Sequence, residues 1–177
     1  MKAALFCLFV TLLVVTTACD DNMVKPVSDQ EVYFEVSYTN FAWGEQFRGF
    51  LIDKDGKIKT YDRPAQWNKV TEKSGLSLTQ LKENLSNSVN TDKSVSMAEL
   101  KENISKINSI TGSSFSKPVA KGADQGQTLF YAYRYDAEKL IYTPILLSQT
   151  GDVESHNTDA AATELSAWLT GVLAKVY

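Results

Sequence analysis

The chain has 177 residues, of which 44% are hydrophobic and 22% are charged, and its formal net charge is −3. This balance is typical of an ordinary globular protein and fits one main domain. Because the basic residues form no cluster, we expect no nucleic-acid partner.

The first 18 residues have the pattern of an export signal. Lys2 is the only charged residue before Cys19, and the stretch from Ala3 to Val15 carries no charge. As a helix this stretch spans about 20 Å, which is too short for a hydrocarbon core of roughly 30 Å. Three small residues then precede Cys19, and a peptidase that cuts after a small residue can bind them. We therefore expect residues 1–18 to be a signal peptide that is removed.

The order Thr16-Thr17-Ala18-Cys19 resembles the lipobox of bacterial lipoproteins, although Thr16 stands where Leu or Val is usual. The resemblance implies that the Cys19 thiol receives lipid and that Cys19 becomes the first residue of a membrane-anchored protein. Two acyl chains suffice for stable anchoring. The alternative is an ordinary secretory leader that contains a cysteine by chance.

Residues 19–30 are expected to form a flexible tether, since they are mostly polar, lack periodicity and contain Pro26. The acidic pair Asp20-Asp21 resembles the export signal of surface lipoproteins in Bacteroidota. In enteric bacteria an Asp beside the cysteine instead resembles an inner-membrane retention signal. The leaflet stays open, with the outer membrane or the cell surface favoured over the inner membrane.

Three strands are predicted next. Residues 31–38 alternate between two faces, one of them apolar, which predicts a strand with one buried face. Residues 47–53 and 57–61 flank Lys54-Asp55-Gly56. An Asp-Gly pair between two such runs predicts a hairpin, because glycine adopts positive φ without strain.

Two amphipathic helices are predicted in the centre of the chain. Ser77 with Gln80, and Ser96 with Glu99, fit the capping-box pattern at a helix start. Apolar residues at helical spacing follow each serine. After them, residues 111–127 are rich in Gly, Ser, Lys and Ala, which predicts a long surface loop.

The last part of the chain predicts three strands and a helix. The strands cover residues 128–135, 140–148 and 153–155, and Pro144 in the second indicates an edge position or a bulge. The helix begins at about Thr158 and carries a wide apolar stripe that a sheet must cover.

These elements predict one α+β domain over residues 31–177. We expect an antiparallel sheet of about five to six strands, with the two central helices and the C-terminal helix packed on one side. Cys7 lies in the leader and Cys19 is the expected lipid site, so no disulfide is expected.

Residues that carry chemistry are few. His156 is the only histidine, and with Asp152 and a serine it is a weak catalytic candidate; an exposed loop position is the simpler interpretation. No phosphate loop and no zinc-ligand cluster is present, and Asp53-Lys54-Asp55-Gly56 fits a hairpin turn better than a calcium loop. We therefore expect neither a metal nor a cofactor.

Aromatic residues are the stronger binding candidates. Phe41 and Trp43 lie in a predicted loop, and Tyr133 and Arg134 lie in a tyrosine-rich strand. Exposed rings stack on sugars or contact protein partners. The alternative is core packing and ordinary cross-strand tyrosine pairs.

Three functions remain open at this stage. The first is a non-catalytic envelope lipoprotein that binds a protein or a glycan. The second is an envelope hydrolase with an unconventional carboxylate or serine site, and the third is a structural or inhibitory module. The stretch from Tyr131 to Leu169 resembles uncharacterised secreted bacterial proteins, a resemblance that implies no activity.

Overall fold

The computed structural model describes residues 30–71, 74–111 and 114–177. The predicted leader 1–18, Cys19 and residues 20–29 of the predicted tether lie outside these ranges. The described part contains three helices, α1 (Leu78–Ser86), α2 (Met97–Ile107) and α3 (Ala160–Val176). It also contains nine strands: β1 (Val32–Asn40), β2 (Gln46–Asp53), β3 (Lys57–Asp62), β4 (Leu76–Ser77), β5 (Val89–Ser94), β6 (Val119–Ala120), β7 (Gln127–Asp136), β8 (Ile141–Gly151) and β9 (Val153–His156).

The strands form one sheet in the order β5-β3-β2-β1-β7-β8-β9-β6, and β4 pairs with β8 off this path. Every pair of strands is antiparallel. The predicted α+β class is therefore confirmed, whereas the expected five to six strands are too few. The missing strands are β4, β5 and β6. Two of these have only two residues, and β5 is mostly polar and exposed, so neither length nor alternation marks them.

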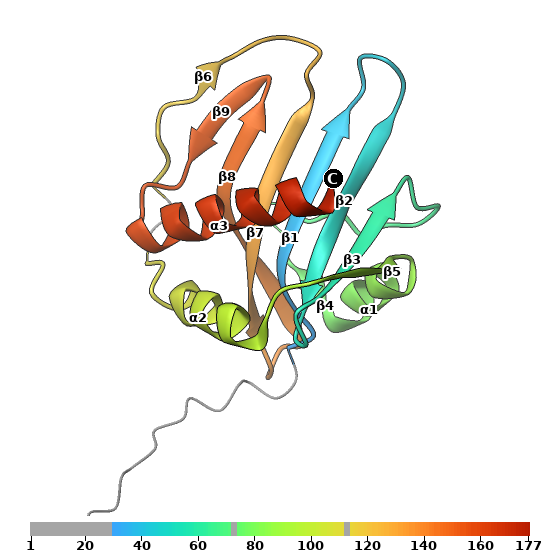
Figure 1. The fold of residues 1–177 in the computed structure, drawn as a ribbon, viewed down its shortest axis with the longest axis vertical. Helices are drawn as coiled ribbons and strands as arrows, with labels where there is room; N and C mark the ends of the chain where they lie inside the picture. The colour runs from blue at the N-terminus through green and yellow to red at the C-terminus, as the bar shows by residue number, and fades with distance from the viewer. Residues whose placement is uncertain (1–29, 72–73, 112–113) are drawn as a thin grey trace, which may run out of the picture.

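The three helices cover both faces of the sheet, so the prediction that all pack on one side is wrong. On the first face, Phe34, Phe50 and Phe130 pack with Leu100 of α2 and Leu165 of α3. Figure 1 shows α3 crossing this face. On the second face, α1 and the segment from 63 to 70 cover Leu51, Tyr133 and Tyr142, with Leu81 and Trp67 in contact. Consequently β1 is buried on both faces, and the expected half-buried strand is also wrong.

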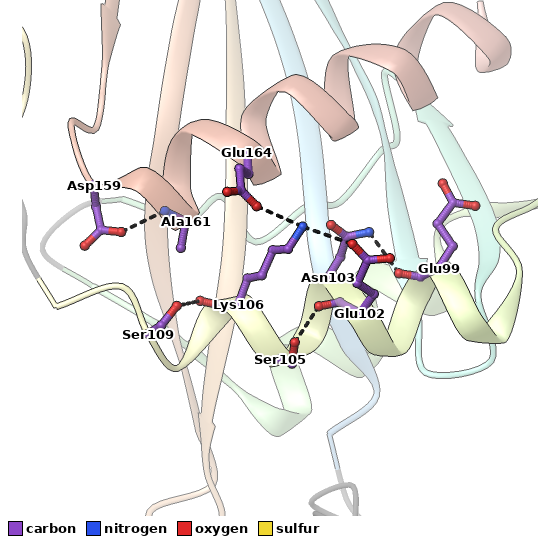
Figure 2. A network of polar contacts seen from close by, with 9 residues as sticks. All are labelled: Glu99, Glu102, Asn103, Ser105, Lys106, Ser109, Asp159, Ala161 and Glu164. Carbon is purple, nitrogen blue, oxygen red and sulfur yellow. Dashed lines mark hydrogen bonds and ion pairs between the residues drawn. The ribbon is translucent and has the colours of Figure 1, made fainter.

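Polar contacts join α2 to α3 on the first face (Figure 2). The Lys106 ammonium group lies 3.3 Å from Glu102 on its own helix and 3.0 Å from Glu164 on α3. The Trp168 indole N–H of α3 donates to the Glu99 carboxylate of α2 at 2.6 Å. These contacts hold the two helices together beside the sheet.

Both predicted helix starts are confirmed. At α1 the Ser77 side chain accepts from the Gln80 backbone, and the Gln80 side chain accepts from the Ser77 backbone, which completes the capping box. At α2 only the first half forms, between Ser96 and Glu99. The carboxylate of Glu99 contacts Trp168 instead, so a tertiary contact replaces the local one.

The strand with Pro144, predicted to have an edge position or a bulge, lies inside the sheet between β7 and β9, and only the stretch around Pro144 is a local edge. On the outer side of β8, β4 pairs with residues 141–142 and β9 pairs with residues 148–149. Pro144 lies between these two paired stretches, where the missing backbone N–H costs no ladder hydrogen bond.

Helices lie at one end of the sheet, and connecting loops lie at the other. The start of β1 lies at one end, together with α1 and α2 (Figure 1). The β1–β2 connection, the segment before β7 and the β8–β9 turn lie at the other end. Within the described ranges, we find no helix with the length and apolar character needed to span a membrane.

Candidate functional site

The end of the sheet away from residue 30 carries the most exposed aromatic side chains of the predicted site. Phe41 is 67% exposed and Trp43 is 80% exposed, and both lie between β1 and β2. Beside them is a groove of about 470 Å³. We call this region the loop-end surface. Its groove is lined by Thr39, Asn40, Phe41, Ala42, Asp124, Gly126, Gln127 and Asp152.

Hydrogen bonds fix the base of the loop-end surface. The Asn40 side chain is buried and donates to the Asp124 carbonyl at 2.9 Å, while its oxygen accepts from the Ala42 backbone at 2.8 Å. The Asp152 carboxylate accepts from the Gln125 backbone at 2.8 Å. Three connections far apart in the sequence are therefore joined, and the exposed rings project from a supported base.

Glycine is required where two of these connections meet. Gly151 has φ of +123°, and a Cβ atom there would lie 2.1 Å from the Gly126 carbonyl oxygen. Gly126 has φ of +78° and packs against the Thr39 carbonyl in the same way. A larger residue at Gly151 would push the β8–β9 turn away from the segment before β7, and one at Gly126 would push that segment away from the end of β1.

The charge of the groove is acidic. Its lining includes the carboxylates of Asp124 and Asp152, and no Lys, Arg or His occurs among the described lining residues. Nearby Lys121 forms an ion pair with Glu154 at 3.0 Å. The groove thus offers hydrogen-bond acceptors beside exposed aromatic rings.

The structure brings only some of the predicted site residues together. Phe41 and Asp152 line the same groove, and Trp43 lies in the loop that carries Phe41. His156 ends β9, four residues after Asp152, so about 13 Å of extended strand separates the two. The structure therefore does not bring the weak catalytic candidates His156 and Asp152 side by side.

Arg134 and Tyr133 lie elsewhere. The Arg134 guanidinium group donates to the Ile107 carbonyl at 2.9 Å and to the Ile110 carbonyl, so it satisfies carbonyl groups at the end of α2. Tyr133 is 1% exposed and its hydroxyl group donates to the Glu35 carboxylate. Neither residue is part of the loop-end surface.

Glu35 is the residue that sequence reasoning missed. It lies in the middle of β1, only 2% exposed, and its carboxylate also accepts from the Tyr61 hydroxyl group at 2.8 Å. Burial raises the pKa of the Glu35 carboxyl group, and the hydrogen bonds from Tyr133, Tyr61 and Trp67 act in the opposite direction.

The two tyrosines respond to the same environment. Burial raises the pKa of both the Tyr61 and Tyr133 hydroxyl groups well above the ordinary value, and the negative charge of Glu35 adds to the effect. Both hydroxyl groups therefore remain protonated donors at neutral pH. A signal for this buried face was present in the sequence, because the unbroken run Phe50-Leu51-Ile52 indicates a strand covered on both sides.

A small cavity of about 70 Å³ adjoins Glu35. It is lined by Glu35, Ser37, Thr39, Phe47, Trp67, Lys69, Val70, Leu129 and Tyr131. We call it the Glu35 cavity. Over the described ranges, no group of three or more His, Cys, Asp or Glu side chains is arranged to hold a metal ion.

Comparisons of the chain with protein family models, with curated proteins and with solved structures found no match.

Proposed function

We propose that this chain is a lipid-anchored protein of the bacterial cell envelope that acts as a non-catalytic binding module. In this proposal Cys19 carries the lipid, residues 19–29 form the tether up to Gln30, whose buried side chain donates to the Val32 and Tyr133 carbonyls, and the loop-end surface contacts the partner. The observation that carries the binding role is the exposure of Phe41 and Trp43 on a hydrogen-bonded base. The outer membrane or the cell surface is the proposed location.

The arrangement of the two ends supports this proposal. The tether would join the domain at residue 30, and β1 carries the chain from there to the loop-end surface. Nine extended residues span about 30 Å. A domain anchored through residue 30 would therefore present Phe41 and Trp43 away from its own membrane, toward a partner in the envelope or outside it.

The chemistry of the groove favours a glycan partner. Exposed aromatic rings stack on the C–H face of a sugar ring, and carboxylate and amide groups accept or share hydrogen bonds with its hydroxyl groups. Asp124, Asp152 and Gln127 supply such groups next to Phe41. The acidic lining disfavours strongly anionic polymers, so a neutral or amino-bearing polysaccharide fits best.

A titration with soluble oligosaccharides from envelope polysaccharides tests the binding role. We expect Trp43→Ala to weaken binding by about tenfold, because one stacking ring contributes roughly 1–2 kcal/mol. The matched control is Met97→Ala, which removes an exposed apolar side chain from α2. Equal affinity of the two variants would contradict the proposed surface, and binding of an envelope protein instead would assign the same surface to a protein partner.

The hydrolase alternative has less support, because Asp152 lies in the turn before β9 and His156 lies at the far end of that strand. A purely structural role would predict that substitutions of Phe41 and Trp43 have no effect on any binding measurement.

A further inference from the structure

The outer side of β8 carries a pocket at its local edge, between the stretch that pairs with β4 and the stretch that pairs with β9. The volume of this pocket is about 550 Å³. Sites for small molecules have volumes of roughly 300–1,000 Å³, so the pocket can hold a small ligand. We call it the Arg134 pocket. Its described lining residues are Ile110, Thr111, Phe115, Tyr131, Arg134, Thr143, Pro144, Ile145, Leu146 and Asn157.

Arg134 is the only charged residue in this described lining. Its guanidinium group has five N–H donors. The hydrogen bonds to the Ile107 and Ile110 carbonyls both come from one nitrogen atom, Nη2, which has two hydrogens. The Nε and Nη1 atoms therefore keep three N–H donors without a protein partner among the described residues. The end of α2 holds the side chain in place and leaves these donors for a ligand.

The carboxylates close to the Arg134 pocket already have other partners. Asp136 lies two residues after Arg134 on the same face of β7, and its carboxylate forms an ion pair with Lys139 at 3.0 Å. The Asp159 carboxylate caps α3 and accepts from the Thr111 backbone at 3.3 Å. Arg134 itself forms no ion pair within the described ranges. Charge complementarity therefore favours an anionic ligand.

The rest of the described lining combines a hydroxyl group with an apolar wall. Thr143 lies directly opposite Arg134 in the register of β7 and β8, which places its Cβ atom about 4.5–5.5 Å from that of Arg134. Its hydroxyl group can donate to the same anion. The apolar wall consists of Ile110, Phe115, Pro144, Ile145 and Leu146. A ligand with one negative group and an apolar body matches both parts.

We propose that the Arg134 pocket binds a small aliphatic carboxylate of the short fatty acid type. Its carboxylate accepts from the free donors of Arg134 and from the Thr143 hydroxyl group, and its alkyl chain lies against the apolar wall. Guanidinium groups form strong charge-assisted hydrogen bonds with carboxylates. This pocket shares no described lining residue with the loop-end groove, so the site is independent of the proposed glycan contact and of the lipid anchor.

The test uses hexanoate as the probe, at neutral pH and constant ionic strength, with the Arg134 Nε–H and Ile145 amide signals in NMR spectra as the readout. We expect a saturable shift with a dissociation constant of the order of millimolar, given the few non-hydrogen atoms of the probe. 1-Hexanol lacks the charge and acetate lacks the alkyl chain, and each should bind at least about tenfold more weakly.

Two outcomes of this titration would overturn the proposal. The first is equal affinity for hexanoate and for either of its counterparts. The second is the absence of a saturable shift with hexanoate up to about 50 mM.

Opposite charges placed at Thr143 give a second test at an exposed position. Thr143→Lys should strengthen hexanoate binding about threefold, and Thr143→Glu should weaken it at least about tenfold, because its carboxylate occupies Arg134. Thr150→Glu is the matched control, since it is an exposed position of the same strand about 23 Å away, and it should change nothing. Equal affinity of the two Thr143 variants, or an equal loss in the Thr150 variant, contradicts the site.

Arg134→Gln separates ligand binding from the structural role of this side chain. We expect hexanoate affinity to fall at least about tenfold, because the charge is lost. A role limited to the end of α2 predicts unchanged affinity in a folded Arg134→Gln protein, and that result would also overturn the proposal. If this variant does not fold, the two Thr143 variants decide, because they leave Arg134 and its contacts with α2 in place.

Discussion

Tyr133 and Tyr135 point to the same face of β7, but their hydroxyl groups have opposite surroundings. The Tyr133 hydroxyl group donates to the buried Glu35 carboxylate. The Tyr135 hydroxyl group is also buried and has no hydrogen-bond partner in the described part of the chain. The Tyr133 hydroxyl group therefore stabilises the fold, whereas the buried Tyr135 hydroxyl group destabilises it.

This contrast gives a matched pair of substitutions. Tyr133→Phe should lower the free energy of unfolding by about 1.5–3 kcal/mol, because a hydrogen bond to a charged group is lost and Glu35 stays buried. Tyr135→Phe should leave the stability unchanged or raise it by up to about 1 kcal/mol, because an unsatisfied hydroxyl group is removed. Denaturant unfolding curves measure both, and a larger loss for the Tyr135 variant would contradict the assigned roles.

Glu35 also makes the stability depend on pH. Burial raises the pKa of its carboxyl group in the folded protein above the ordinary value of 4.5. The folded state then holds this proton more tightly than the unfolded chain does. The contribution of Glu35 to stability is therefore fully present below the unfolded pKa and is lost as the pH rises through the folded pKa.

Glu35→Gln removes this titration. As the pH rises above the ordinary value of 4.5 and through the raised pKa of Glu35, the stability of the variant relative to the wild type should increase. Melting temperatures of both proteins over this range give the comparison, in which the other titrating groups cancel. Parallel profiles, or a relative loss of stability in the variant at high pH, would show that the fold does not raise the pKa of the Glu35 carboxyl group.

At the scale of elements, α1 and α2 have similar sequences, but their buried asparagines have different hydrogen-bond partners. Both contain a Leu-Lys-Glu-Asn run, and in both the asparagine is buried. In α1, Asn84 accepts from the Asn68 backbone at 2.8 Å and donates to its carbonyl at 2.8 Å. In α2, Asn103 donates to the Glu99 carbonyl of its own helix at 2.8 Å.

The two asparagines should therefore respond differently to substitution. Asn84→Ala should cost about 2–3 kcal/mol and loosen the segment that carries Trp67 and Lys69, because both polar groups of the Asn68 backbone lose their partner. Asn103→Ala should cost about 1 kcal/mol or less, since it removes one local bond. Unfolding curves and hydrogen exchange of the Trp67 indole N–H measure the two effects. Similar behaviour of both variants would mean that Asn84 does not fasten this segment.

The elements with strong local signals could be predicted from the sequence. The Asp-Gly hairpin, the two serine caps and the strand with Pro144 all depend on residues near each other in the chain. The distribution of the helices over two faces could not be predicted from the sequence. Hydrophobic periodicity gives the apolar side of a helix, but it does not give the sheet face that this side contacts. Glu35 was assigned to an exposed face for the same reason: α1 and the segment from 63 to 70 cover it from a distance in the sequence.

The candidate sites also differ in whether they depend on residues close together in the chain or far apart in it. The aromatic loop with Phe41 and Trp43 was evident in the sequence, because loop position and residue type suffice to suggest exposed rings. Arg134 depends on the end of α2, and the Glu35 cavity depends on four separate segments. Such assemblies of distant residues have no signature in one sequence.

At the scale of the whole molecule, the proposed anchor and the proposed binding end predict separate effects. Cells grown with a labelled fatty acid should incorporate the label into the mature protein through Cys19. The Cys19→Ser protein should lack the label and leave the membrane fraction, because two acyl chains hold a protein far more firmly than its surface does. An unlabelled wild-type protein, or a variant processed and retained identically, would contradict the lipid anchor.

Retention of the lipid-free protein on its partner tests the central claim most directly. Without lipid, Cys19→Ser protein should still sediment with isolated envelope polysaccharide through the loop-end surface. Adding Phe41→Ala and Trp43→Ala should reduce the bound fraction by about tenfold or more, while Met97→Ala should leave it unchanged. If the protein without Phe41 and Trp43 were retained as well as its parent, the loop-end surface would not be the binding site.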